Sequence, residues 1–91
     1  MSNWGSDLRY HIEMAIEKIE VTAYAGHRDD ERPMAFSLHG EGIEVFAILR
    51  RWIEEDIENR ARKRFFLVRG SDSYVHKIYF DEEKREWFAV T

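Results

Sequence analysis

Cysteine is absent from this chain of 91 residues, and proline occurs once, at Pro33. Without cysteine the chain can form no disulfide bond, no thiolate zinc site and no cysteine nucleophile. No apolar run approaches the roughly 18 residues of a membrane-spanning helix, and the first residues show no basic start followed by an apolar run. From these absences we expect a cytoplasmic protein without an export signal and without membrane contact.

Hydrophobic and aromatic residues are nevertheless plentiful, at 44% and 14% of the chain. A chain of this length buries roughly two-thirds of its unfolded surface, which is enough for one small core but not for two domains. We expect residues 1–17 to form an N-terminal arm or short helix, and residues 18–91 to form a single β-rich domain.

Alternation of apolar and polar residues is the dominant pattern of the chain. It predicts strands near residues 18–25, 33–39, 43–50, 64–70 and 74–80, with a sixth near residues 86–90. The "HGEG" segment at residues 39–42 lies between two alternating runs and therefore predicts a β-hairpin. The fold class is mainly β, with α+β possible: a single small antiparallel sheet or a partly open barrel of five to six strands.

Two stretches permit either a helix or a strand, residues 8–16 and residues 46–60. Leu8, Ile12 and Ile16 recur at helical spacing, but alternate residues of the same stretch are also apolar. Ile48, Leu49 and Trp52 likewise fit a helix face or a strand. We expect a short helix at the N-terminus, at residues 53–62, or at both. The predicted core is Ile19, Val21, Phe36, Leu38, Val45, Ile48, Trp52, Phe66, Val68, Ile78 and Trp87.

A series of short motifs resembles a family of small uncharacterised bacterial β-rich domains. The motifs are Tyr-x-Gly-x-Arg, Glu-Arg-Pro, Phe, Gly, Val-x-x-Ile-Leu-x-x-Trp, Phe-x-Val and a terminal Trp, over about residues 18–91. They correspond here to Tyr24, Gly26, Arg28, Glu31, Arg32, Pro33, Phe36, Gly40, Val45, Ile48, Leu49, Trp52, Phe66, Val68 and Trp87. The resemblance implies a mostly antiparallel β fold and favours a strand before Trp52. It implies no activity, cofactor or catalytic residue. Members of the family have a shorter link after that Trp, so the extra residues here predict an added helical turn.

Catalytic chemistry has little support in the sequence. The four histidines lack zinc-ligand spacing, and "GEG" is too short for a phosphate-binding loop. His39 could pair with Glu41 or Glu44, although a hairpin turn needs polar residues there in any case. The acidic runs at residues 29–31 and 81–83 fall where solvated turns are expected. We therefore predict no catalytic residue, no cofactor, no metal site and no enzymatic activity.

Charge is uneven along the chain, whose net charge is −4. Residues 50–70 carry seven Lys or Arg against four Asp or Glu, which makes this segment locally basic. A solvated face explains such a cluster, and so does contact with a phosphate or an acidic partner. The candidate interaction surface is Arg28, Arg32, Arg50, Arg51, Arg60, Arg62, Lys63 and Arg64. The favoured hypothesis is a non-catalytic protein-interaction or accessory module that binds another protein. The alternative is a nucleic-acid-binding accessory domain that uses residues 50–64, and a small-molecule binder or small enzyme is third.

Overall fold

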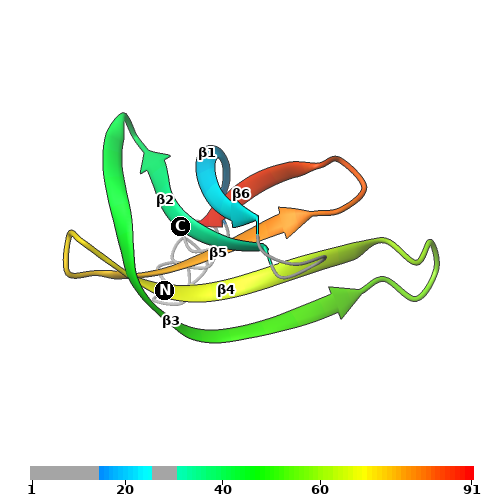
Figure 1. The fold of residues 1–91 in the computed structure, drawn as a ribbon. Coiled ribbons are helices and arrows are strands. Elements are labelled where there is room, and N and C mark those ends of the chain that lie inside the picture. Colours follow the sequence, from blue (N-terminus) through cyan, green and yellow to red (C-terminus); the bar gives the residue numbers. More distant parts are fainter. Residues whose placement is uncertain (1–14, 26–30) are drawn as a thin grey trace, which may run out of the picture.

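Six antiparallel strands form a closed barrel in the order β1-β2-β3-β4-β5-β6, in a computed structural model that describes residues 15–25 and 31–91 (Figure 1). The strands are β1 (Ile16–Ala25), β2 (Glu31–Leu38), β3 (Glu41–Glu55), β4 (Arg62–Gly70), β5 (Val75–Asp81) and β6 (Glu86–Val90). The mainly β prediction is confirmed, and the barrel is closed. No helix in the described ranges is long and apolar enough to span a membrane.

The hairpin between β2 and β3 is confirmed at the predicted place. Its two turn residues, His39 and Gly40, have φ of 54° and 79°, and Leu38 pairs with Glu41 across the turn. A two-residue turn with positive φ at both positions matches the twist of the flanking strands. Non-glycine residues with positive φ also lie in the following three turns, at Arg60, Ser73 and Arg85.

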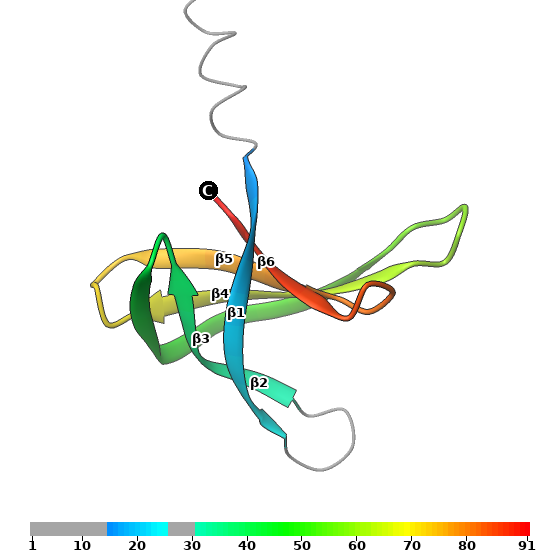
Figure 2. The ribbon, with the colours of Figure 1, turned by 90° about the horizontal axis from the view of Figure 1, so that it is seen from above.

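The helix predicted at residues 53–62 is wrong. β3 continues through Glu55, and β4 returns from Arg62, so the two strands form a hairpin that extends beyond the neighbouring β5–β6 turn (Figure 2). Glu54 lies opposite Lys63 and Glu55 opposite Arg62, and opposite charges facing each other across a strand pair stabilise the pairing. Asp56 closes the turn, because its carboxylate accepts hydrogen bonds from the backbone N–H groups of Glu58 and Asn59.

The other predicted helix falls mainly outside the described residues, since residues 1–14 are not described. Ile16 and Glu17, which the sequence assigned to an arm or helix, belong to β1. They pair with Val90 and Ala89 of β6, and this pairing closes the barrel.

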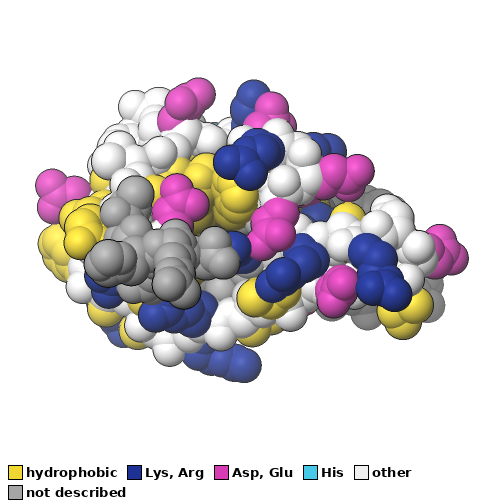
Figure 3. Space-filling model, turned by 45° about the vertical axis from the view of Figure 1, so that its right-hand side comes forward, with side chains coloured by type: hydrophobic (Ala, Val, Ile, Leu, Met, Phe, Trp, Pro, Cys, Tyr) yellow, Lys and Arg dark blue, Asp and Glu magenta, His cyan; other side chains and the backbone are white. Residues whose placement is uncertain are grey.

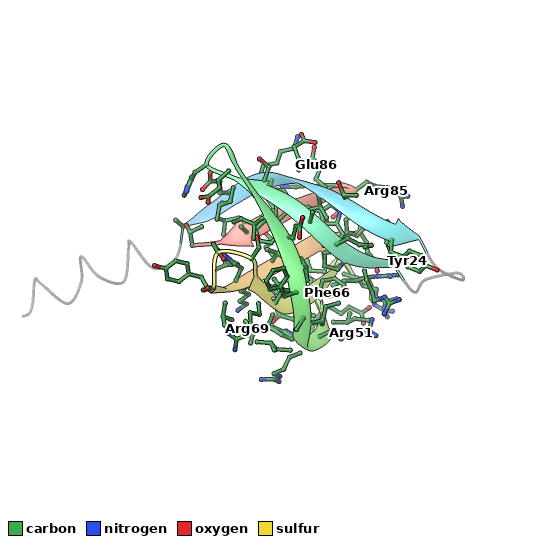
Figure 4. The ribbon with its side chains drawn as sticks, turned by 60° about the vertical axis from the view of Figure 1, so that its left-hand side comes forward. Tyr24, Arg51, Phe66, Arg69, Arg85 and Glu86 are labelled. Atoms are coloured by element: carbon green, nitrogen blue, oxygen red, sulfur yellow. The ribbon has the colours of Figure 1, made fainter. Side chains whose placement is uncertain are left out.

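The barrel core is built from one face of each strand. Its buried members are Ile19, Phe36, Ile43, Phe66, Val68, Ile78 and Ala89, and Val21, Leu38, Val45, Ile48 and Trp87 pack against them. In Figure 4 Phe66 lies within the ring of strands. All but one of the predicted core residues belong to this cluster, while Ile43 and Ala89 were not predicted.

Trp52 is the predicted core residue that the structure places elsewhere. It lies opposite Phe65, whereas the core residues Phe66 and Val68 project to the other face of β4 because side chains alternate along a strand. Ile48 and Trp52 would share a face in a regular strand, but the register shift between Ile48 and Arg50 reverses the alternation and places Trp52 on the opposite face from Ile48.

Candidate interaction surface

A groove runs between β2 and β3, where the two strands separate. Their register extends from the pair Leu38–Glu41 to the pair Ala35–Glu44, and beyond that point β3 pairs with β4 instead. Three hollows follow one another along the separation, with volumes of about 360, 560 and 430 Å³. They are lined by Tyr24, residues 31–34 and 45–53, Arg62 and Arg64. We call this set the β2–β3 groove.

Three register shifts place large apolar side chains along this groove. The pairing skips Met34 in β2, and it skips Phe46 and Leu49 in β3, so each is an extra residue in a β-bulge. Their exposed fractions are 52%, 65% and 43%, and all three line the groove. A bulge turns a side chain out of the regular alternation and is a feature that proteins use to re-aim it. The bulges therefore account for the apolar part of the groove.

Two further exposed apolar residues, Tyr24 and Ile53, line the same groove. Monomeric proteins rarely collect exposed apolar side chains in one place unless the place is a contact surface. The space-filling view shows apolar atoms at the surface among interspersed acidic and basic side chains (Figure 3).

Arginines supply the polar part of the groove. Its lining contains Arg32, Arg50, Arg51, Arg62 and Arg64, with Glu31 as the acidic member. The lining thus has an excess of positive charge in a protein whose net charge is −4. In the view of Figure 4, Arg51 and Tyr24 both lie toward the right-hand end of the molecule.

The structure divides the predicted basic surface between two faces. Arg62 and Arg64 line the groove, whereas the ammonium group of Lys63 lies 5.9 Å from the centre of the Tyr79 ring on the opposite face of β4. Alternation along a strand separates neighbours in this way, and the "RARKR" run cannot present all its cations to one partner. Arg60 lies in the β3–β4 turn, and Arg28 lies outside the described residues.

Several of these arginines have defined contacts. The Arg64 Nε atom lies 2.6 Å from Glu82 Oε2, and the Arg62 Nε atom lies 4.0 Å from Glu82 Oε1. The guanidinium group of Arg32 lies 5.4 Å from the centre of the Tyr24 ring. Such contacts hold the side chains in place.

Four aromatic rings form a continuous row on the outer face of the barrel. Trp52, Phe65, Tyr79 and Phe88 lie opposite one another on β3, β4, β5 and β6. Their ring centres are separated by 5.3, 4.8 and 5.2 Å, and the first pair is nearly parallel, at 7°. Contacts of this length are typical of favourable ring packing. We call these residues the aromatic row.

Cations lie over each ring of the aromatic row. Arg50 lies over Trp52, Lys77 over Trp52 and Phe65, Lys63 over Tyr79, and Lys84 over Phe88, at 5.3–5.9 Å from the ring centres. Phe65 and Tyr79 are each 6% exposed. Their faces are therefore covered by the stems of these cations and by neighbouring rings, which suits a second packing layer better than an open stacking surface.

Tyr79 gives the aromatic row a measurable pH dependence. Burial, together with the negative charge of Asp81, raises the pKa of the Tyr79 hydroxyl above its usual 10.0. A raised folded-state pKa means that the stability linked to this group is complete below about pH 10 and is lost as the pH rises through the raised pKa. We expect Tyr79→Phe to lose less thermal stability above pH 10 than the unaltered protein does. Melting temperatures of both proteins measured from below to above pH 10 check this prediction. Tyr74→Phe is the control, since Tyr74 is exposed and its replacement should leave the loss of stability at alkaline pH unchanged.

The histidines of the described residues contact acidic side chains. His39 pairs with Glu17, with 2.8 Å between Nε2 and Oε1, and not with Glu41 or Glu44 as the sequence suggested. His76 lies 2.9 Å from Asp72 Oδ2. Burial opposes ionisation of Asp72, but hydrogen bonds from the Tyr74 backbone and from His76 lower the pKa of that carboxyl overall. Across residues 15–25 and 31–91, no group of three or more His, Asp and Glu side chains is placed to hold a metal ion.

Sequence reasoning identified the arginines of the groove but missed its apolar members. Met34 was assigned to a strongly apolar strand face, and Phe46 and Leu49 to a segment that could be helix or strand. The signal in the sequence is the failure of strict alternation at "VFAIL", residues 45–49, where apolar residues run together. Such a run also suits a buried strand, so pattern alone does not reveal a bulge.

Comparison of the chain with family models, with characterised proteins and with solved structures found no match. The family resemblance drawn from the short motifs therefore stays a prediction.

Proposed function

We propose that this protein is a non-catalytic interaction module that binds another protein in the β2–β3 groove. The observation that carries the proposal is the convergence of three exposed, bulged apolar side chains and five arginines on one groove. Interfaces are enriched in aromatic residues, methionine and arginine, and this lining has the same composition. The bulged positions contribute nothing to the barrel core, so a contact role explains their apolar character.

A displayed library of random peptides tests this proposal. We expect the full chain to enrich binding peptides, and we expect Phe46→Asp to weaken their binding by about tenfold or more, since a charge would replace an apolar anchor. Phe46 is 65% exposed, so the variant should keep its thermal stability. Tyr74→Asp is the matched control, because Tyr74 is 69% exposed and lies outside the groove lining. If no peptide is enriched, or if both variants bind equally well, the groove is not a protein-binding site.

Nucleic-acid binding is the second candidate, and the aromatic row with its cations is the observation that favours it. Stacked rings beside lysines and arginines are a common arrangement for single-stranded nucleic acid. Against it, Phe65 and Tyr79 are each 6% exposed, so bases could not reach their faces without displacing the cations. A titration with single-stranded and duplex oligonucleotides at about 50 mM salt distinguishes the candidates, because phosphate contacts are strong at low salt. Salt-sensitive binding that is lost when Lys63 and Lys77 are changed to Ala would replace our proposal with this one.

A further inference from the structure

The backbone of β3 has one edge that faces the β2–β3 groove. Within the described residues, positions 45–55 of β3 pair with β4 and with no other strand, since the β2–β3 register ends at the pair Ala35–Glu44. Residues 31–33 of β2 pair with β1 on their far side. Residues of β2 and β3 nevertheless line the same three hollows. The groove is therefore an opening between two strand edges.

An open strand edge is a template for a further strand. Half of its backbone N–H and C=O groups point away from the paired neighbour and can bond to an extended peptide. The bulges at Phe46 and Leu49 interrupt the regular spacing of these groups. An arbitrary flat strand cannot match that edge along its whole length, so the bulges exclude unselective pairing.

The charge of the groove indicates the chemistry of the added strand. The groove carries five arginines against Glu31 and against Glu82, which pairs with Arg64, so a positive excess remains to attract carboxylates. Four of the arginines are exposed at the surface. A second copy of this chain fits poorly, because a two-fold contact would bring the same arginine-rich lining to both sides of the interface. The exposed Phe46 and Met34 supply apolar contacts at one end of the groove.

We infer that the β2–β3 groove takes an extended, acidic segment of another protein as an added β-strand on the free edge of β3. This inference depends on the proposed function and adds two properties to it, the backbone pairing and the charge of the partner. In the bound state the partner's backbone bonds to residues 45–53 of β3. Its carboxylates lie near the arginines, and an apolar side chain packs between Met34 and Phe46.

Backbone methylation tests the pairing. The probe is the tightest-binding peptide recovered from the displayed library, synthesised with N-methyl groups on one or the other set of alternate residues. Successive backbone N–H groups of an added strand point in opposite directions, so one methylated set should weaken binding by about tenfold or more and the other should leave it nearly unchanged. Equal effects of the two sets would overturn strand addition while leaving groove binding intact.

Three further measurements test the backbone pairing, the charge of the partner and the identity of the occupant separately. Peptide binding should slow hydrogen exchange at the β3 amides that face the groove, and unchanged exchange there would contradict strand addition. Replacing the acidic residues of the peptide with Lys should abolish its binding, and retained binding would overturn the acidic-partner part of the inference. Light scattering of the protein alone tests whether a second copy of this chain occupies the groove. We expect a monomer, and a dimer that dissociates in the Phe46→Asp variant would overturn the inference.

Discussion

Replacing Phe66 with alanine should lower the free energy of unfolding by about 3–5 kcal/mol. Phe66 is 4% exposed, belongs to the buried cluster and lies 5.8 Å from the Trp87 ring, centre to centre. The substitution removes a buried ring and leaves a cavity that closely paired strands cannot fill by collapsing. Because a small domain has a total stability of about 5–15 kcal/mol, the loss is a large part of the whole.

Denaturant unfolding followed by tryptophan fluorescence measures this effect. Phe46→Ala is the matched control, since it removes the same ring from a position that is 65% exposed and outside the buried cluster. We expect the control to change stability by about 0.5 kcal/mol or less. Similar midpoints for the two variants would mean that Phe66 does not lie in the core.

Replacing Gly70 with alanine is the second substitution with a large expected effect. A β-carbon at this position would lie 2.6 Å from the Ile43 Cγ2 atom and 2.7 Å from the Asp72 Oδ1 atom. The Ile43 side chain is buried and cannot move away freely, and Asp72 also holds His76 and the Tyr74 backbone. Overpacking of this kind costs about 1–3 kcal/mol, and more where the backbone must shift.

Gly42→Ala provides the comparison for Gly70→Ala. Gly42 also lies in a strand, but a β-carbon there would have no heavy atom within 4 Å. Removing the conformational freedom of glycine from the unfolded chain should then leave stability unchanged or raise it by about 0.4–1 kcal/mol. Thermal unfolding of both variants measures the two changes in stability. Equal melting temperatures would contradict the close approach of Ile43 to Gly70.

The groove and the aromatic row share Trp52 and Arg50, but their other aromatic residues and cations differ. The cations near the row are held over rings that are already packed, and they stabilise the outer face of β4, β5 and β6. The groove instead combines exposed apolar side chains with a free backbone edge, which packing within the barrel does not use. Because of this contrast we propose a peptide partner in preference to a nucleic acid.

The β3–β4 hairpin shows how local pattern and tertiary pairing compete. Residues 53–62 are rich in good helix formers, and a helix satisfies their backbone groups without a partner. In the barrel, β4 is already fixed by its pairing with β5 over Lys63–Arg69, and it offers its other edge to β3. Cross-strand pairing then extends outward along Glu54 and Glu55, because their opposing residues are Lys63 and Arg62.

The sequence by itself determined the approximate positions of six strands and most of the core, because alternation, turn residues and aromatic content act over a few neighbouring positions. It did not determine the outer part of β3, where a helix was predicted at residues 53–62. It also determined that cysteine chemistry is absent and that the basic charge gathers in residues 50–70. The tertiary structure decided the closure of the barrel through the pairing of β1 with β6, and it decided which cations share a face. It also decided the bulges at Met34, Phe46 and Leu49. The physical reason is that a bulge is set by the register of a strand pair whose facing residues, such as Ile48 and Val68, are many positions apart in the sequence. Each single shift in register moves the following side chains to the opposite face until the next shift.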